Sequence, residues 1–199
     1  MSRTKPSDEN KKIAKHAAAA FGGAPSVSEY LHDTEPLAIP ILSCENSPCE
    51  GVTAYSTVGL SDFPMVDAGG ADFPVRLEIA GACATQAAQF ANVVSTAAFI
   101  IMRTRKPYHP GAVMRGVVQE YFPATTVPHL YFTTPFLWED SPKTLDCGTK
   151  KASWLLVVPI SDAEMRFLEK HGDKALEDLF EKEQIDVFDL DRSLSLIHI

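Results

Sequence analysis

The spacing of apolar residues predicts a buried helix near the middle of the chain. Between residues 85 and 103, apolar side chains recur at three- and four-residue intervals, and Phe99 and Ile100 extend the apolar surface around the cylinder. A helix that is apolar on most sides is buried on most sides. We therefore expect residues 85–103 to form a core helix packed on a sheet.

Short apolar runs predict strands before and after this helix. These runs are rich in β-branched and aromatic residues, which favour strands. Pro40 would confine its strand to a sheet edge or a bulge, because proline cannot donate to a ladder. Strands that follow each other without a helix are expected to pair antiparallel. The predicted strands cover residues 26–32, 38–44, 52–60, 73–79, 113–122, 129–138 and 152–160.

The strand at 73–79 alternates in part between apolar and charged residues. Val75, Leu77 and Ile79 lie on one side of it, and Arg76 and Glu78 lie on the other. Residues 61–72, which contain a proline and a Gly-Gly pair, are predicted to form the loop before it.

Capping signals predict where the last two helices begin and end. Ser161 and Glu164 have the spacing of a capping box, and Ile160 and Met165 that of a hydrophobic staple. Gly172 is predicted to end this helix. A second helix is expected at 173–182, followed by an extended segment at 186–192, and an N-terminal helix is expected at 7–21.

The order of these elements predicts an α+β fold. A helix, four strands, a helix, three strands and two helices form segregated runs, which are typical of a mixed, largely antiparallel sheet packed with helices. The chain has 199 residues and no repeat or linker-like stretch. We therefore expect a single domain at 25–193, with residues 1–24 as a helix of the same domain and 194–199 as a tail.

The charge of the chain is negative and unevenly placed. Eighteen Lys and Arg against 26 Asp and Glu give a net charge of −8, which disfavours binding to nucleic acid or to an anionic membrane. Eleven acidic and five basic residues fall within 162–192, whereas no acid lies between Glu78 and Glu120. We expect an acidic face and a small basic patch.

The four cysteines are expected to be free thiols. No secretory signal opens the chain, so a reducing cytoplasm is the expected compartment. Cys44 and Cys49 lack a second ligand pair at zinc spacing, so neither a metal nor another cofactor is predicted. Catalytic motifs are also missing from the sequence. A nucleophilic pair could be made from Cys83 and His109, but the position of Cys83 at a strand-to-helix junction favours a buried structural thiol.

Two surface stretches are candidate partner-binding sites, because loops on a rigid support often carry function. The first is cationic and aromatic, although the dipole of the preceding helix also attracts cations to its C-terminus. In the second, a tryptophan either anchors a partner or closes the end of the core. The candidates are Arg105, Lys106, Tyr108 and His109 in the first stretch, and Trp138, Glu139 and Asp140 in the second.

Several motifs resemble the suppressor-of-fused-like domain. TVGLSDFP (57–64) followed by VRLEIAG (75–81) is similar to the family's strand, glycine-leucine-serine turn and acidic strand. Residues 154–172 look like its late strand and helix, and DVFDLDR (186–192) looks like its closing Asp-Arg element. The resemblance spans residues 25–193 and is closest to the short bacterial members of the family, of the antitoxin or immunity-protein type.

The resemblance implies that the chain binds a protein. The animal relative holds a transcription-factor peptide with the help of a second domain that this chain lacks, whereas bacterial relatives include immunity proteins that neutralise toxins. We therefore predict a non-enzymatic, cytoplasmic immunity protein with a toxin as its partner. The alternatives are a regulatory domain acting on a transcription factor and an enzyme with a pocket that uses His109 or Cys83.

Overall fold

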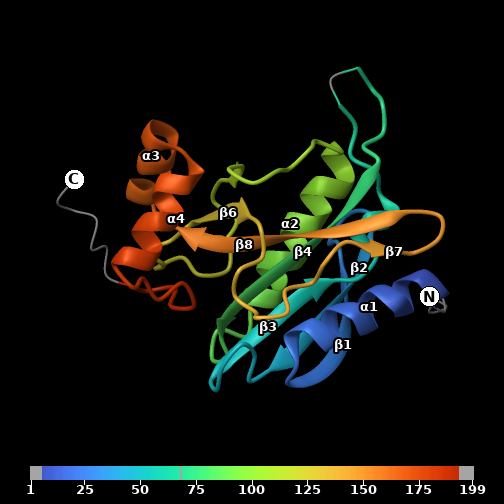
Figure 1. Ribbon diagram of the computed structural model, residues 1–199, viewed down its shortest axis with the longest axis horizontal. Helices are drawn as coiled ribbons and strands as arrows, with labels where there is room; N and C mark the ends of the chain where they lie inside the picture. The colour runs from blue at the N-terminus through green and yellow to red at the C-terminus, as the bar shows by residue number, and fades with distance from the viewer. Residues whose placement is uncertain (1–5, 68, 193–199) are drawn as a thin grey trace.

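The computed structural model describes residues 6–67 and 69–192, which form one mixed sheet with helices on both faces (Figure 1). The strands follow the order β1-β2-β3-β4-β8-β6-β5, and β7 pairs with β8 beside this path. The predicted α+β class is confirmed, whereas the predicted tail at 194–199 lies outside the described residues. The elements are α1 (Asp8–Phe21), β1 (Ala24–Leu31), β2 (Ala38–Glu45), β3 (Val52–Thr57), the 3-10 helix η1 (Leu60–Asp62), β4 (Val75–Ala84), α2 (Phe90–Thr104), β5 (Val113–Met114), β6 (His129–Thr133), β7 (Leu145–Asp146), β8 (Lys151–Ile160), α3 (Asp162–His171) and α4 (Asp173–Lys182).

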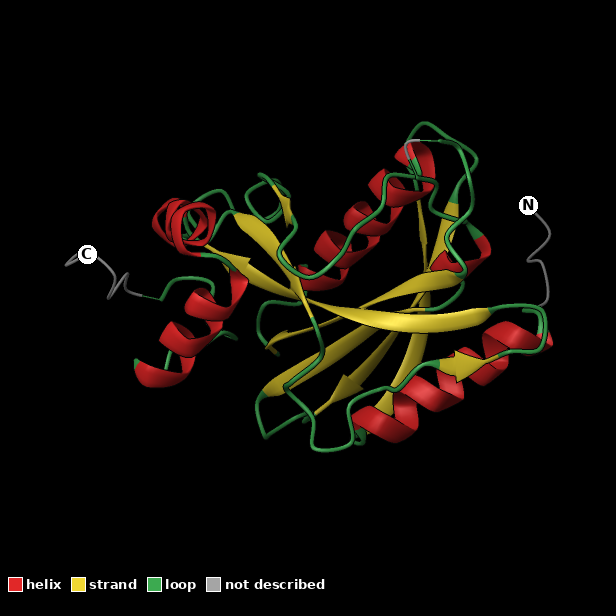
Figure 2. Cartoon of the chain, turned by 45° about the horizontal axis from the view of Figure 1, so that its top comes forward, coloured by secondary structure: helices red, strands yellow, loops and turns green. Residues whose placement is uncertain are grey.

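The sheet separates two apolar clusters. On one face α2 packs against side chains such as Ile41 and Ile79. On the other face α1 buries Ile13, Ala17 and Phe21, and this cluster continues to α3 and α4. Figure 2 shows α1 and α2 on opposite sides of the strands. The central strands are therefore covered on both faces, which explains why every residue of β3 is buried.

Strand β8 joins the two halves of the sheet. Strands β1 to β4 form an antiparallel meander, as expected for consecutive strands. β8 then lies parallel to β4, with Val75 opposite Lys151, and antiparallel to β6, with His129 opposite Ile160. The sheet is thus largely antiparallel but mixed at its centre.

The position of Pro40 corrects one prediction. Its strand, β2, pairs with β1 on one side and β3 on the other, so it is neither an edge strand nor bulged at this residue. The last β2–β3 pair joins Thr57 to Ile41, the residue that directly follows the proline. The ladder ends there with a hydrogen bond from Val58 N–H to the Pro40 carbonyl (2.9 Å), so the missing proline N–H falls where the pairing stops.

Several predicted elements are shorter in the structure, among them the central helix and the strand that follows it. α2 begins at Phe90 rather than at Thr85, because β4 continues to Ala84 and the Thr85 N–H is bound to the Gly51 carbonyl (2.8 Å). The strand predicted at 113–122 covers only 113–114. Gly116 ends the strand, because its positive φ of 78° is not a strand conformation. Its N–H donates to His129 Nδ1 (3.0 Å).

The segment predicted to be extended at 186–192 forms turns instead. The Asp186 carboxylate accepts a hydrogen bond from the Phe188 N–H (3.0 Å), and the Asp189 carboxylate accepts one from the Asp191 N–H (2.9 Å). Aspartate favours such local turns because its short side chain reaches the backbone two residues ahead.

The predicted ends of α3 and α4 are confirmed. Ser161 caps α3, and both hydrogen bonds of the capping box with Glu164 are present. Gly172, at a φ of 86°, ends α3 and precedes α4. These two helices lie together at one end of the sheet, next to the end of β8 (Figure 1). No helix among residues 6–67 and 69–192 is long and apolar enough to cross a membrane.

Candidate functional site

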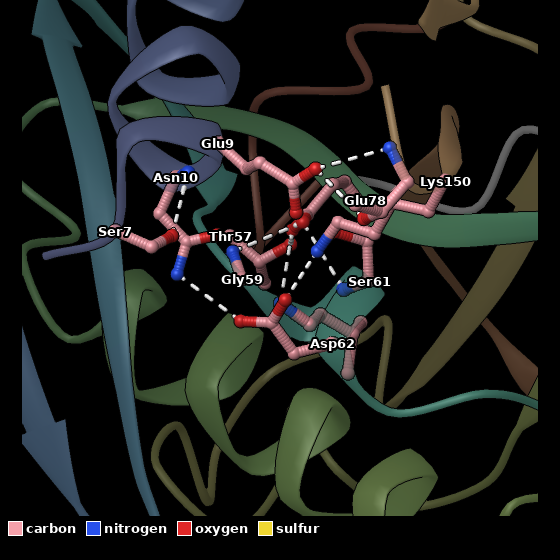
Figure 3. Close-up of polar contacts among 11 residues, drawn as sticks. Ser7, Glu9, Asn10, Thr57, Gly59, Ser61, Asp62, Glu78 and Lys150 are labelled. Atoms are coloured by element: carbon pink, nitrogen blue, oxygen red, sulfur yellow. Dashed lines mark hydrogen bonds and ion pairs between the residues drawn. The ribbon is translucent and has the colours of Figure 1, made fainter. Parts of the chain in front are cut away.

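A buried carboxylate, Glu78, holds the turn that follows β3. Its side chain has no solvent exposure. Oε1 accepts hydrogen bonds from the backbone N–H groups of Gly59 (3.0 Å) and Ser61 (3.1 Å), as Figure 3 shows. Oε2 accepts one from the Leu60 N–H (3.3 Å) and one from the Thr57 hydroxyl. Burial raises the pKa of Glu78, and the hydrogen bonds from Thr57, Ser61 and Gly59 oppose this shift because they favour the carboxylate.

The local sequence explains why three N–H groups point at one carboxylate. Gly59 adopts a φ of 99°, which turns the chain out of β3. A Cβ at this position would lie 2.8 Å from Asn10 Nδ2, so the turn also needs the small residue for space. Consecutive N–H groups in such a turn form an anion-binding concavity. Here the protein's own Glu78 carboxylate occupies this concavity, so the contact stabilises the fold and leaves no room for an external anion.

A second layer of polar contacts connects this turn to α1. Asp62 Oδ2 accepts a hydrogen bond from Asn10 Nδ2 (3.1 Å), and Asp62 Oδ1 forms an ion pair with Lys150. Glu9 Oε1 accepts hydrogen bonds from the N–H (3.3 Å) and hydroxyl (2.8 Å) of Thr149. The contacts in Figure 3 therefore fasten α1, the β3 turn and the loop before β8 together.

A buried ion pair fixes the last described residue to α3. The Arg192 guanidinium donates to both carboxylate oxygens of Glu164 (3.0 Å each) and to the Pro159 carbonyl (2.8 Å). Glu164 also accepts from the Ser161 N–H (2.6 Å), as the capping box requires. The opening of α3 is thus a scaffold that holds the segment 186–192 against the domain.

The first predicted binding stretch is partly engaged within the protein. Arg105 ends α2 with a φ of 52°, donates through Nε to the Pro64 carbonyl (2.9 Å) and pairs with Asp72 (3.2 Å). Tyr108 is half-buried, with its ring centroid 4.6 Å from that of Phe132. Arg105 therefore holds the loop at 61–72, and Tyr108 packs against β6.

Lys106 and His109 from the same stretch are exposed. His109 borders a shallow depression together with Arg115 and Glu169, and its Nδ1 lies 2.7 Å from the Pro110 carbonyl oxygen. These two side chains are accessible to a partner, and their role in binding stays a prediction.

Trp138 is a core residue. Its position contradicts the prediction that it is an exposed anchor for a partner. Only 5% of it is exposed, and it stacks on Phe21 with a centroid distance of 4.3 Å. Its indole N–H donates to the Ser47 hydroxyl (3.1 Å). Trp138 thus closes the end of the core beside α1. Glu139 and Asp140 are exposed, and their partner-binding role stays a prediction.

The structure does not bring together Cys83 and His109, the pair considered as a nucleophile and its base. Cys83 is buried near the start of α2, where its thiol donates to the Phe188 carbonyl (3.3 Å) and burial raises its pKa to about 12. His109 lies beyond the far end of α2, a helix of 15 residues and therefore about 22 Å long. Among residues 6–67 and 69–192, no three His, Cys, Asp or Glu side chains are grouped so that they could hold a metal ion.

One hollow on the described surface is an apolar groove with acidic walls, which we call the α4 groove. It lies between α4 and the segments 134–137 and 185–188 and has a volume of about 580 Å³. Phe136, at its edge, is 49% exposed. The lining residues are Thr134, Phe136, Leu137, Glu177, Asp178, Phe180, Glu181, Ile185, Asp186, Val187 and Phe188.

Neighbouring contacts hold the walls of this groove in place. Glu177 accepts hydrogen bonds from the Tyr131 hydroxyl (2.9 Å) and from the Thr133 hydroxyl. Across the groove, the Phe188 carbonyl accepts from the N–H of Ala84 (3.2 Å) and from the Cys83 thiol. The groove walls are therefore supported by hydrogen bonds from β6 and from the end of β4, which are far apart from each other in the sequence.

The sequence indicates that this region is acidic but gives no sign of the groove. The signal for α4 was present, since Leu176 and Phe180 are buried four residues apart while Asp178 and Glu181 face solvent. The position of Phe136 is not predicted, because the strand expected at 129–138 ends at Thr133 in the structure.

Comparisons with known proteins agree with the resemblance seen in the sequence. The model of the family described as Suppressor of fused protein (SUFU) matches residues 35–193. A similar relative is "Immunity protein YqcF" of Bacillus subtilis (strain 168), which is 41% identical over 185 residues, covering 92% of this chain and 95% of the relative.

Solved structures share the fold at low sequence identity. A putative SUFU homolog from Neisseria gonorrhoeae FA 1090 matches with a TM-score of 0.67 and 15% identity, over 96% of this chain and 98% of that chain. The Sufu–Fu complex matches with a TM-score of 0.69 and 14% identity, over 96% of this chain and 93% of that chain. Drosophila Suppressor of Fused matches with a TM-score of 0.65 and 13% identity, over 92% of this chain but only 50% of that chain. With the family model covering most of its length, this chain belongs to the Suppressor of fused (SUFU) family.

Proposed function

We propose that this chain is an immunity protein, a non-enzymatic antitoxin that binds a bacterial toxin in the cytoplasm and neutralises it. The observation that carries the proposal is the 41% identity to Immunity protein YqcF over nearly the full length of both chains. Family membership adds that protein binding is the expected activity, because a SUFU-fold chain has been solved in the Sufu–Fu complex. The fold alone would not carry the proposal, since one fold hosts many functions.

The described side chains support binding rather than catalysis. The carboxylates Glu78 and Glu164 are both occupied by hydrogen-bond donors of the protein itself. Cys83 and His109 lie at opposite ends of α2. A nucleophile needs a base within hydrogen-bond reach, and this pair lacks that geometry. We therefore propose that the protein acts through binding of a partner at its surface.

Co-expression tests the proposal. A toxin-like gene next to the gene for this chain is expressed in a host cell with and without the chain, and growth is measured. We expect growth only when the chain is present, and we expect a complex when the chain is purified with an inactivated form of the toxin. An unrelated acidic protein expressed at the same level is the control for charge.

The dose dependence separates a binding protein from an enzyme. A binding protein neutralises toxin in a fixed ratio, so purified chain should abolish toxin activity at about one equivalent. An enzyme would inactivate an excess of toxin over time. Failure to protect cells together with failure to form a complex would refute the proposal, and recovery of a DNA-binding protein as the sole partner would favour the regulatory alternative.

A further inference from the structure

We propose that the α4 groove is the docking site for a basic, amphipathic segment of a protein partner. The inference rests on the proposed function only for the identity of the partner, which under that function is the toxin. The chemistry of the groove itself is independent of that partner's identity. The groove combines an apolar floor, acidic walls and a fixed geometry.

The floor of the groove offers apolar surface that is accessible to a partner. Phe180 and Val187 are buried beneath it, whereas Phe136 is 49% exposed at its edge. Exposed aromatic side chains beside a hollow are typical of protein interfaces, where aromatic anchors supply much of the binding energy. The volume of about 580 Å³ is sufficient for a few large side chains of a partner.

The walls give the groove one sign of charge. Glu177, Asp178 and Glu181 follow one another along α4, and Asp186 lies in the opposite segment. None of the eleven lining residues is a lysine or arginine. An apolar floor between carboxylates matches a segment that carries apolar residues on one side and Lys or Arg beside them. An acidic or uncharged segment would leave the negative charge of these carboxylates unbalanced.

The geometry of the groove is fixed before a partner arrives. The hydrogen bonds from Tyr131 and Thr133 hold Glu177, and a carboxylate with two donors retains acceptor capacity for a third. The opposite wall is fixed by the backbone contact between Ala84 and Phe188. Such preorganisation lowers the entropic cost of association. The groove therefore presents a prepared surface, unlike Arg105, which is engaged with Pro64 and Asp72.

The first experiment uses a defined probe. A helical peptide of alternating leucine and lysine clusters is titrated into the isotope-labelled full chain, and the leucine–glutamate version of the same peptide is the comparison. We expect saturable changes in the NMR signals of Phe136, Asp178, Glu181 and Phe188 with the basic peptide only. Changes that map to another surface, or equal binding of the acidic peptide, would overturn the inference. Contacts from residues 193–199 to the groove that the peptide fails to displace would also overturn it.

Charge reversal with a matched control sharpens the result. Asp178→Lys with Glu181→Lys changes the groove, and Glu29→Lys with Glu50→Lys makes the same charge change at exposed positions outside it. None of these four side chains forms a side-chain hydrogen bond or ion pair in the described structure, so both variants are expected to fold. We expect the groove variant to weaken peptide binding by about tenfold or more and the control by less than about twofold. Equal weakening would show general electrostatic attraction and overturn the inference.

The same variants are then tested for protection against the toxin. If the unaltered chain protects and the groove variant does not, the groove is the toxin site. If both protect equally, the inference fails while the proposed function stands. If the unaltered chain does not protect, the proposed function fails, and the peptide experiment still decides whether the groove binds a basic segment.

Discussion

Glu78 and Glu164 are both nearly inaccessible carboxylates, at 0% and 2% exposure, yet they are accommodated in different ways. Glu78 is surrounded by neutral donors, three of them backbone N–H groups of the turn after β3. Glu164 is paired with the guanidinium of Arg192. Side-chain donors can be removed together with the acceptor, but backbone donors remain whatever residue replaces the glutamate. Glu78 should therefore be harder to replace than the ion pair.

Removal of Glu78 is expected to have the largest effect. Glu78→Ala leaves the three N–H groups and the Thr57 hydroxyl without their acceptor, and each buried orphan donor costs about 1–3 kcal/mol. We predict a loss of at least about 4 kcal/mol in the free energy of unfolding, measured by urea denaturation. Glu45→Ala, at an exposed position of β2, is the control and should change it by less than about 0.5 kcal/mol. A loss below about 1 kcal/mol for Glu78→Ala would contradict this account.

Removal of Arg192 is expected to rank second. Arg192→Ala leaves Glu164 buried with only the Ser161 backbone contact, and breaking a buried pair costs about 3 kcal/mol or more. The exposed Arg115, which pairs with Glu169, is the control, since its replacement by alanine should cost less than about 1 kcal/mol. Similar losses for the two arginines in thermal or urea denaturation would show that burial does not matter here.

Replacement of both partners is expected to recover most of the loss. Glu164→Leu with Arg192→Met removes both charges, so only the lost half of the capping box and the repacking remain, and the variant should lie within about 2 kcal/mol of the natural chain. No second substitution can rescue Glu78→Leu in this way, because its donors belong to the backbone. A double variant less stable than Arg192→Ala alone would refute the distinction between the two carboxylates.

The pH dependence of Glu78 gives the smallest effect. Because burial raises the pKa of Glu78 in the folded state, its contribution to stability is fully present below the unfolded pKa of about 4.3 and is lost as pH rises through the folded value. The difference in unfolding free energy between the natural chain and Glu78→Gln should therefore shrink as pH increases from 4 to 8. A difference that grows over this range would show that the turn donors outweigh burial and lower the pKa of Glu78.

Local signals in the sequence were sufficient to predict part of this picture. The ends of α3 depend on Ser161, Glu164 and Gly172, which act within a few residues, and all three roles are confirmed. The family resemblance also pointed to the 57–64 turn and to the strand that carries Glu78. The depth of Glu78 could not be read from alternation, because period two assigns a residue to a face of the strand but does not say what covers that face.

Two further errors come from long-range packing. Trp138 is buried because Phe21 of α1 and Ser47 meet it from positions about a hundred residues away in the chain. The α4 groove likewise needs the segments 134–137 and 185–188 to come together with α4. A single sequence carries no signal for such meetings, so the surface around Lys106, His109, Glu139 and Asp140 and that around the groove could not be ranked.

The parallel contact between β4 and β8 has a consequence for synthesis of the chain. Val75 faces Lys151, so β4 must wait for a partner that lies 76 positions further along. At a translation rate of about 5–20 residues per second, the interval lasts roughly 4–15 s. During it the meander β1–β4 exposes the unpaired edge of β4, and such non-local pairing is slow to form. The sheet is therefore complete only after β8 has been synthesised. A partner that needs the whole sheet binds the finished domain and not its nascent N-terminal half.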